Sequence, residues 1–399
     1  MRQHAHVLLL TTLTLLGGTL TVHAQGVISG NEFNPAISLI LDGQYSSYSN
    51  DAEDYEISGF PLDEEAGLTA EGFSLDESEL NISANVDDQF YGYADIVFTD
   101  TEGETEVELE EAWFETLALP AGFVVKGGKF LSGIGYHNAF HPHSWDFSDE
   151  PLAYRAMLGK AFTDVGVQGR WVAPTDLFLT FGGEAFRGDS YPAQGSANDG
   201  TGAFSLFAKA GGDLGASHSW KAGLSWLSYD VEDAGLEAQD GDLLLNGDGD
   251  LYVAEFVWKW APNGNARERN FKLQAEYLHR EEDGDADFEG LSGNQSGGYD
   301  TDQDGVYVQG VYQFMPRWRV GLRYDWLSAD NRTPGITAAT PFDGDDREPD
   351  RYTFMVDFSN SEFSRLRLQV SEDNSSADSD TQVVLQYVLS IGAHGAHAF

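Results

Sequence analysis

Apolar and polar residues alternate along many short segments of this chain, and residues 317–328 show the pattern clearly. Trp318 and Leu322 fall on one side of that segment, whereas Arg319 and Arg323 fall on the other. A period of two indicates a β-strand whose two faces meet different surroundings. About sixteen such segments follow one another, and none of the sequence between them has the period of an amphipathic helix.

The connections between these segments alternate between short and long. The short turns contain Pro, Gly, Asn or Asp, which suit tight reversals, and lie at 86–88, 117–122, 173–176, 212–217, 314–318 and 359–362. The long connections are predicted loops at 49–71, 131–165, 230–249, 281–304 and 329–350. Short turns at one end and long loops at the other are typical of a transmembrane barrel. The sequence therefore predicts an all-β fold, a single antiparallel β-barrel of about 16 strands.

The beginning of the chain reads as a secretory signal peptide. Arg2 precedes an apolar stretch at 7–20, and Val22-His23-Ala24 offers a small-residue cleavage site. The apolar stretch is short for a membrane anchor. We therefore assign residues 1–24 to a signal peptide and residues 25–399 to the barrel.

The last strand carries a second signal. Apolar residues recur at every second position from Val383 to Ile391, and the chain ends at Phe399. A terminal aromatic residue in that register resembles the signal that barrel-assembly machinery reads. The expected location is the outer membrane of a Gram-negative bacterium, in contact with its lipid and lipopolysaccharide.

The amino-acid composition excludes some classes of partner and some kinds of site. The formal charge is −44 over 399 residues, which disfavours nucleic acid as a partner. The chain has no Cys, so disulfides and thiolate metal sites are excluded. Many acidic residues fall in the predicted long loops, where they either keep the rim hydrated or bind divalent cations such as Ca²⁺. Residues 300–305 match the opening of a calcium loop, but Val311 replaces the closing Glu.

Charged residues on the polar side of the strands must face inward, because arginine at the centre of a bilayer costs about 2–4 kcal/mol. The basic residues with that parity are Arg319, Arg323, Arg351, Arg365, Arg367, Lys221, Lys259 and Lys272. Glu77 and Glu79 are the inward acids of the second strand. Opposed walls of charge orient dipolar solutes in a pore. We therefore predict a charged aqueous lumen lined by these residues.

The third connection, 131–165, differs from its acidic neighbours, because it is aromatic-rich and rather apolar. Such a loop is better suited to folding toward the lumen and narrowing it than to solvent. It contains His137, His141, His143 and Asp146. Imidazole and carboxylate are good zinc ligands, so two interpretations remain open: a zinc site, or residues that hydrogen-bond within the constriction.

Residues 108–135, ELEEAWFETLALPAGFVVKGGKFLSGIG, resemble the phosphate-selective porins. This resemblance covers one hairpin and implies a sixteen-stranded porin that assembles as a homotrimer. The chain lacks a lysine-rich cluster that would carry phosphate selectivity. The segments HPHSWDF (141–147) and QYVLSIGAHGAHAF (386–399) also resemble zinc-regulated outer-membrane receptors. The chain is too short for a plug and a twenty-two-stranded barrel, so that resemblance implies passive uptake.

The expected function is a passive outer-membrane channel, or porin, for small hydrophilic or charged solutes, with no required cofactor. The alternative is a zinc-linked uptake protein or receptor that uses the loop histidines. A barrel hydrolase would need a spaced Ser-His-Asp set. His143-Ser144 and His218-Ser219 are merely adjacent pairs, so we predict that the protein is not an enzyme.

Overall fold

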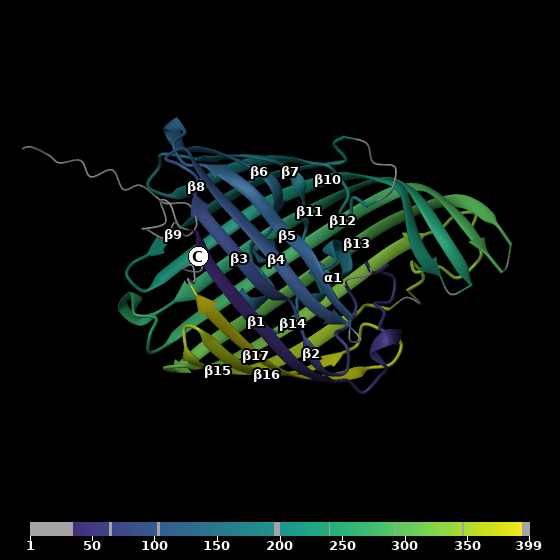
Figure 1. The fold of residues 1–399 in the computed structure, drawn as a ribbon. Coiled ribbons are helices and arrows are strands. Elements are labelled where there is room, and N and C mark those ends of the chain that lie inside the picture. Colours follow the sequence, from purple (N-terminus) through teal and green to yellow (C-terminus); the bar gives the residue numbers. More distant parts are fainter. Residues whose placement is uncertain are drawn as a thin grey trace, which may run out of the picture.

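The computed structural model describes residues 35–63, 66–101, 104–194, 200–238, 240–291, 293–344 and 347–392. The predicted signal peptide and Phe399 lie outside the described residues. One antiparallel sheet closes on itself (Figure 1). Its strands in the first half are β1 (Ala36–Ser47), β2 (Gly72–Leu75), β3 (Ser78–Asn85), β4 (Phe90–Thr101), β5 (Glu104–Thr116), β6 (Phe123–Leu131), β7 (Thr163–Val172), β8 (Phe178–Phe186) and β9 (Ala203–Leu214). The second half has β10 (His218–Ala238), β11 (Gly241–Trp260), β12 (Asn270–Gly290), β13 (Gln295–Met315), β14 (Trp318–Arg332), β15 (Asp350–Ser361), β16 (Ser364–Asp373) and β17 (Asp380–Gly392).

The first strand closes the barrel. On one side β1 pairs with β17, and on the other it pairs with both β2 and β3. Since β2 and β3 are two parts of one crossing that is interrupted at Asp76 and Glu77, the barrel has sixteen crossings, as predicted. Closure gives every strand of the wall a hydrogen-bonded neighbour on both sides, which is what a hydrocarbon environment demands. Among the described residues, no helix is long and apolar enough to cross a membrane.

The two faces of the wall differ as the alternation predicts. Leu224, Leu322 and Tyr352 point outward and are well exposed. Arg323, which follows Leu322, and Arg351, which precedes Tyr352, point inward and are buried. The sheet has this arrangement because successive side chains of a strand point to opposite faces.

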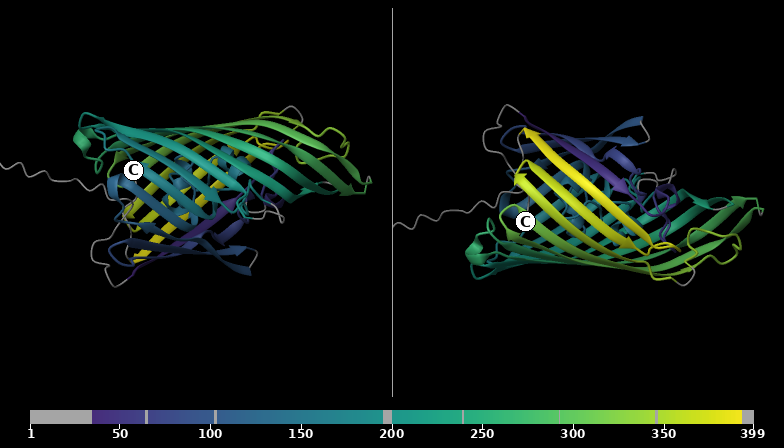
Figure 2. Two further views of the ribbon diagram at one scale, coloured as in Figure 1. Left: turned by 90° about the horizontal axis from the view of Figure 1, so that it is seen from above. Right: turned by 90° about the horizontal axis from the view of Figure 1, so that it is seen from below.

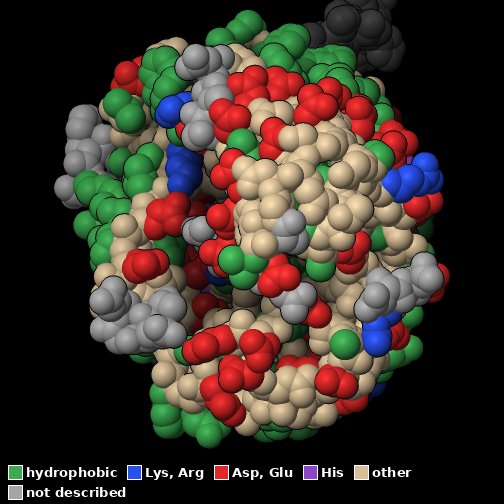
Figure 3. Space-filling model, turned by 90° about the vertical axis from the view of Figure 1, so that its right-hand side faces the viewer, with side chains coloured by type: hydrophobic (Ala, Val, Ile, Leu, Met, Phe, Trp, Pro, Cys, Tyr) green, Lys and Arg blue, Asp and Glu red, His purple; other side chains and the backbone are tan. Residues whose placement is uncertain are grey.

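The two ends of the barrel are different. The short turns gather at the end near the described C-terminus, which we call the turn end (Figure 1). The other end, called the loop end, carries the long connections and the tips of β10–β13, which project beyond the other strands (Figure 2). Seen from the loop end, acidic side chains crowd the surface around a hollow (Figure 3).

Two of the predicted long loops are wrong. Most of 230–249 and 281–304 is strand, because the β10–β11 and β12–β13 hairpins continue to tight reversals near Ala238 and Gly290. Outside the membrane, backbone pairing holds a hairpin together and its outer face need not be apolar. These acidic segments therefore lack the apolar–polar alternation by which a strand is recognised in the sequence. The residues at 300–305 that match the opening of a calcium loop do not form a loop, because they are extended within β13.

A hydrophobic core lies inside the barrel toward the loop end. The connection between β6 and β7, residues 132–162, is called loop 3; it lies inside the barrel and includes the helix α1 (Leu152–Leu158). Every residue of α1 is buried, and the helix packs against β13 and β14. Ile57 and Phe60 of the first long connection join the same core. Loop 3 is thus the element that positions the candidate site.

Candidate functional site

Local sequence shapes loop 3 into short turns. Two 3-10 turns, His137–Ala139 and Pro142–Ser144, precede α1. Pro142 sits at the first position of its turn, where a missing N–H costs nothing. Gly159 ends α1 with a φ of 72°, a left-handed conformation that favours glycine. These breaks let one loop present side chains to opposite walls of the barrel.

On one wall, loop 3 is tied down by Asp146. Its carboxylate accepts hydrogen bonds from Lys272 Nζ on β12 at 3.0 Å and from Arg319 Nη1 on β14 at 2.8 Å. Burial alone would raise the pKa of the Asp146 carboxyl, but the positive charges of Lys272 and Arg319 outweigh burial and hold it well below its ordinary value. Asp146 is therefore an anion at any physiological pH.

Asp149 is a second tie on the same wall. It accepts from Arg323 Nη2 at 2.8 Å, from Arg351 Nη1 at 3.0 Å and from Gln369 Nε2 at 2.8 Å. Burial acts to raise the pKa of Asp149, but the two guanidinium groups hold it well below its ordinary value. These ion pairs join loop 3 to β14 and β15.

Backbone carbonyls of loop 3 use the remaining guanidinium donors. Arg351 Nη2 donates to the carbonyl of Glu150 at 2.7 Å, Arg365 Nη2 to that of His143 at 2.7 Å, and Arg367 Nη2 to that of Trp145 at 2.8 Å. The loop is thus held by charge-assisted bonds along its length, which are stronger than neutral ones.

The structure places all the predicted basic residues on the inner side of the wall, but it divides them into two groups. Arg323, Arg351 and Arg367 are covered by loop 3, with exposed fractions of 3%, 0% and 0%. They hold the loop and do not border open space, which changes the expected arginine-lined lumen. The others are half-buried near the turn end of their strands, although three of them also bond to loop 3. They are called the turn-end cations: Lys221, Lys259, Lys272, Arg319 and Arg365.

On the opposite wall, the loop meets carboxylates. His143 Nδ1 lies 2.6 Å from Glu79 Oε1 on β3. His141 Nδ1 lies 3.1 Å from Glu110 Oε2, and its Nε2 lies 3.1 Å from Glu111 Oε2, both on β5. Glu77, the other predicted inward acid, pairs with Lys160 Nζ of loop 3 at 2.8 Å.

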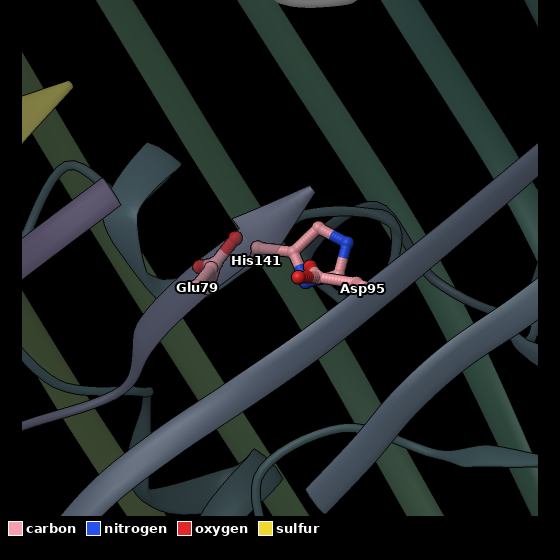
Figure 4. Close-up of side chains that lie close together, drawn as sticks. All are labelled: Glu79, Asp95 and His141. Carbon is pink, nitrogen blue, oxygen red and sulfur yellow. The ribbon is translucent and has the colours of Figure 1, made fainter. Parts of the chain in front are cut away.

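Asp95 of β4 completes this second wall, since its Oδ2 lies 3.5 Å from His141 Nδ1. Figure 4 shows Glu79, Asp95 and His141 gathered from three separate elements. Burial alone would lower the pKa of His141, but Glu110 and Glu111 raise it well above its ordinary value. The arrangement favours a positive charge at His141.

The structure does not bring together the predicted zinc set of His137, His141, His143 and Asp146. The ring of His137 packs 4.6 Å from that of Trp145 and 4.7 Å from that of Tyr154. Asp146 is paired with cations across the barrel from His141. The separation has a physical cause: the aspartate is drawn to the basic wall, and the two later histidines to the acidic one.

Sequence reasoning missed Asp95, Glu110 and Glu111. A register shift between β4 and β5 places Asp95 opposite Glu111 and Ile96 opposite Leu109, which leaves Glu110 as an extra residue. Such a bulge lets two adjacent side chains face the same way. The signal was the Glu-Glu pair itself, because in regular alternation one of these carboxylates would face lipid.

Three solved structures share this fold. The loop L8 deletion mutant of OmpT, an outer membrane protein of Vibrio cholerae, covers 90% of this chain and 99% of its own at 10% identity, with a TM-score of 0.55. The outer membrane channel DcaP of Acinetobacter baumannii covers 90% and 97% at 14% identity, with a TM-score of 0.54. The anion-selective porin from Comamonas acidovorans covers 90% and 99% at 11% identity, with a TM-score of 0.50. The fold is therefore that of porin-like outer-membrane β-barrels.

In sequence, no family model matches the chain. A protein of Aquifex aeolicus, described as uncharacterised, is 30% identical over 404 residues, which cover 93% of this chain and 81% of that protein. The chain belongs to the same family as this Aquifex protein. The finer resemblances to phosphate-selective porins and zinc-regulated receptors stay predictions.

Proposed function

We propose that this protein is a passive channel in the outer membrane of a Gram-negative bacterium, for small hydrophilic or charged solutes. The observation that carries the proposal is the group of five half-buried turn-end cations inside a closed barrel with an apolar exterior. Lysine and arginine that face a sealed apolar core would be costly, whereas they are stable where water reaches them. The porin-like fold supports the same function.

Loop 3 is the constriction of this channel. It crosses the bore between an acidic wall, which contains Glu79 and Asp95, and the basic wall at Asp146 and Asp149. A solute that passes beside the loop therefore travels between groups of opposite sign, a field that orients dipolar solutes. The solute meets the negative charges of the acidic rim at the loop end first and the positive charges of the turn-end cations afterwards.

The remaining parts of the proposal concern the surroundings of the channel. The loop end faces outside the cell, because outer-membrane barrels place short turns on the periplasmic side. Lipid and lipopolysaccharide contact the apolar girdle, assembly machinery reads the terminal strand ending at Phe399, and three copies form a homotrimer. Permeation requires no covalent chemistry and no cofactor.

The test is planar-bilayer recording with the full mature chain, purified as a folded barrel in detergent. Stepwise ohmic conductance, together with swelling of liposomes in small sugars, is the expected result. A correctly folded barrel that inserts into the bilayer without any conductance and leaves liposomes impermeable to every small solute would overturn the proposal. Hydrolysis of bilayer lipid by the same sample would point to an enzyme instead.

A further inference from the structure

We propose that Glu79, Asp95 and His141, with Glu110 beside the imidazole, form a binding site for a divalent transition-metal ion, of which Zn²⁺ is the best-matched probe. The site lies inside the barrel, where loop 3 meets β3, β4 and β5. It shares His141 with the predicted zinc set but takes its other ligands from the wall carboxylates instead of from His137, His143 and Asp146. The bound ion would fasten loop 3 to the acidic wall, opposite the ion pairs of Asp146 and Asp149.

The distances suit a single ion. One ligand atom each from Glu79, Asp95 and His141 lies within 4.8 Å of the other two. His141 Nδ1 is 3.1 Å from Glu110 Oε2 and 3.5 Å from Asp95 Oδ2. Tetrahedral ligands that are each about 2.0–2.1 Å from zinc lie about 3.3 Å apart. A single N–H shared between the two oxygens would serve each with poorer geometry, whereas an ion bound to Nδ1 would attract both carboxylates.

One of the buried carboxylate oxygens has no hydrogen-bond donor in the described part of the chain. The side chains of Asp95 and Glu79 are both 0% exposed. Asp95 Oδ1 has no hydrogen-bond donor within the described part of the chain. A buried carboxylate oxygen without a donor costs free energy unless a cation compensates for it. This fully buried oxygen distinguishes the site from an ordinary cluster of surface acids.

Charge balance also favours a dication. Glu79, Asp95, Glu110 and Glu111 bring four carboxylates to His141. Lys126 supplies positive charge near Glu111. Carboxylate oxygens with an imidazole nitrogen are the ligand types that zinc, iron and manganese accept, whereas calcium prefers oxygen alone.

Neighbouring groups already orient the ligands. Asn81 Nδ2 donates to Glu79 Oε2 at 3.1 Å, and His143 Nδ1 lies 2.6 Å from Glu79 Oε1. His141 Nε2, the nitrogen that faces away from Asp95, lies 3.1 Å from Glu111 Oε2. A carboxylate on the second imidazole nitrogen is the usual partner of a metal-bound histidine, because it fixes the tautomer and makes the ligand more basic.

The inference stands apart from the channel proposal, since binding in detergent needs no permeation. The experiment is calorimetric titration of ZnCl₂ into the chelator-treated, folded full mature chain, with CaCl₂ as a second titrant. We expect one equivalent of Zn²⁺ to bind, no comparable binding of Ca²⁺, and at least a tenfold loss of Zn²⁺ affinity in both H141Q and D95N. H218Q, a histidine substitution at the turn end, is the matched control that should keep the same equivalent.

Zinc X-ray absorption gives a second readout. It is measured on the zinc-loaded wild-type protein, so misfolding of a variant cannot influence it. The expected first shell contains nitrogen and oxygen with at least one imidazole. The proposal is overturned if no stoichiometric Zn²⁺ binds, if folded H141Q and D95N bind like the wild type, or if the shell lacks imidazole. In those cases a protonated His141 alone balances the carboxylates.

Discussion

Arg351 Nη1 lies 3.0 Å from Asp149 Oδ2, although 202 residues separate the two in the chain. Arg351 belongs to the barrel wall and is fully buried, whereas Asp149 belongs to loop 3. A buried guanidinium without a partner is strongly unfavourable. The wall and the loop therefore stabilise each other: the arginines hold the loop inside the bore, and the loop neutralises the arginines.

Replacing Asp149 by Asn should release loop 3. The substitution keeps the shape but removes the charge that faces Arg323 and Arg351. Breaking a buried ion pair from one side costs about 3–5 kcal/mol. We expect a lower thermal midpoint in detergent and a larger or more frequently open conductance in bilayers.

The matched control for D149N is D330N. Asp330 pairs with Arg332 at 3.2 Å, but both side chains are about two-thirds exposed, at 69% and 67%. Exposed pairs contribute about 0–1 kcal/mol, so D330N should leave both readouts near those of the wild type. Equal behaviour of D149N and D330N would contradict the role of the loop 3 ion pairs.

Acid should weaken the protein through His137. Burial and the nearby charge of Arg323 lower the pKa of His137 well below its ordinary value of 6.5. The folded state keeps His137 neutral while the unfolded state takes up a proton below pH 6.5, so stability is complete above that pH and falls as pH drops through 6.5 toward the folded pKa. The loss is up to about 1.4 kcal/mol per pH unit.

The charged groups near His137 are Lys272 and Glu276 on β12, Arg323 on β14, and Asp146 and Asp149 in loop 3. H137F keeps the packing against Trp145 and Tyr154 but cannot titrate. Thermal midpoints from pH 7.5 to pH 5 should therefore decline less steeply in H137F than in the wild type. Parallel declines would show that His137 is not the responsible group.

The turn-end cations should set ion selectivity. In the double variant K221A/K259A, two half-buried positive charges disappear from the inner wall. The reversal potential in a salt gradient should shift toward cations, because the local anion concentration falls. K129A removes a lysine that pairs with Glu108 at 2.8 Å on the outer face, and should not change the reversal potential. An unchanged reversal potential in K221A/K259A would show that these two lysines do not act on the permeating ions.

An arginine on the lipid face should impair the barrel. Leu322 is 64% exposed and points outward from β14. L322R places a charge in the hydrocarbon region and should cost about 2–4 kcal/mol, seen as reduced folding yield in lipid vesicles. D330R lies on the same strand with the same parity, but beyond the aromatic residues Tyr324 and Trp326, and should fold normally. Equal yields would contradict the assignment of this face to lipid.

Much of the barrel could be predicted because its pattern is local. In RWRVGLRYDWLS a shift of one residue would turn Arg319 and Arg323 toward lipid and Leu322 toward the interior, so the alternation determines both the strand and its orientation. The alternation of turns and loops similarly indicates the two ends. The hairpin tips of β10–β13 could not be recognised, because backbone pairing outside the membrane leaves no apolar pattern.

By itself, the order of residues determined that the chain forms a closed antiparallel sheet of a transmembrane type, and, except at the β4–β5 bulge, it determined which side chains point inward. Which inward groups meet was decided by the tertiary structure. His141 lies by Asp95 and Glu110, while Asp149 lies by Arg351, because loop 3 crosses the bore with its histidines toward one wall and its aspartates toward the other. Those contacts join residues tens to hundreds of positions apart, and electrostatic pairing in a confined, poorly hydrated space selects them; no local period encodes that choice.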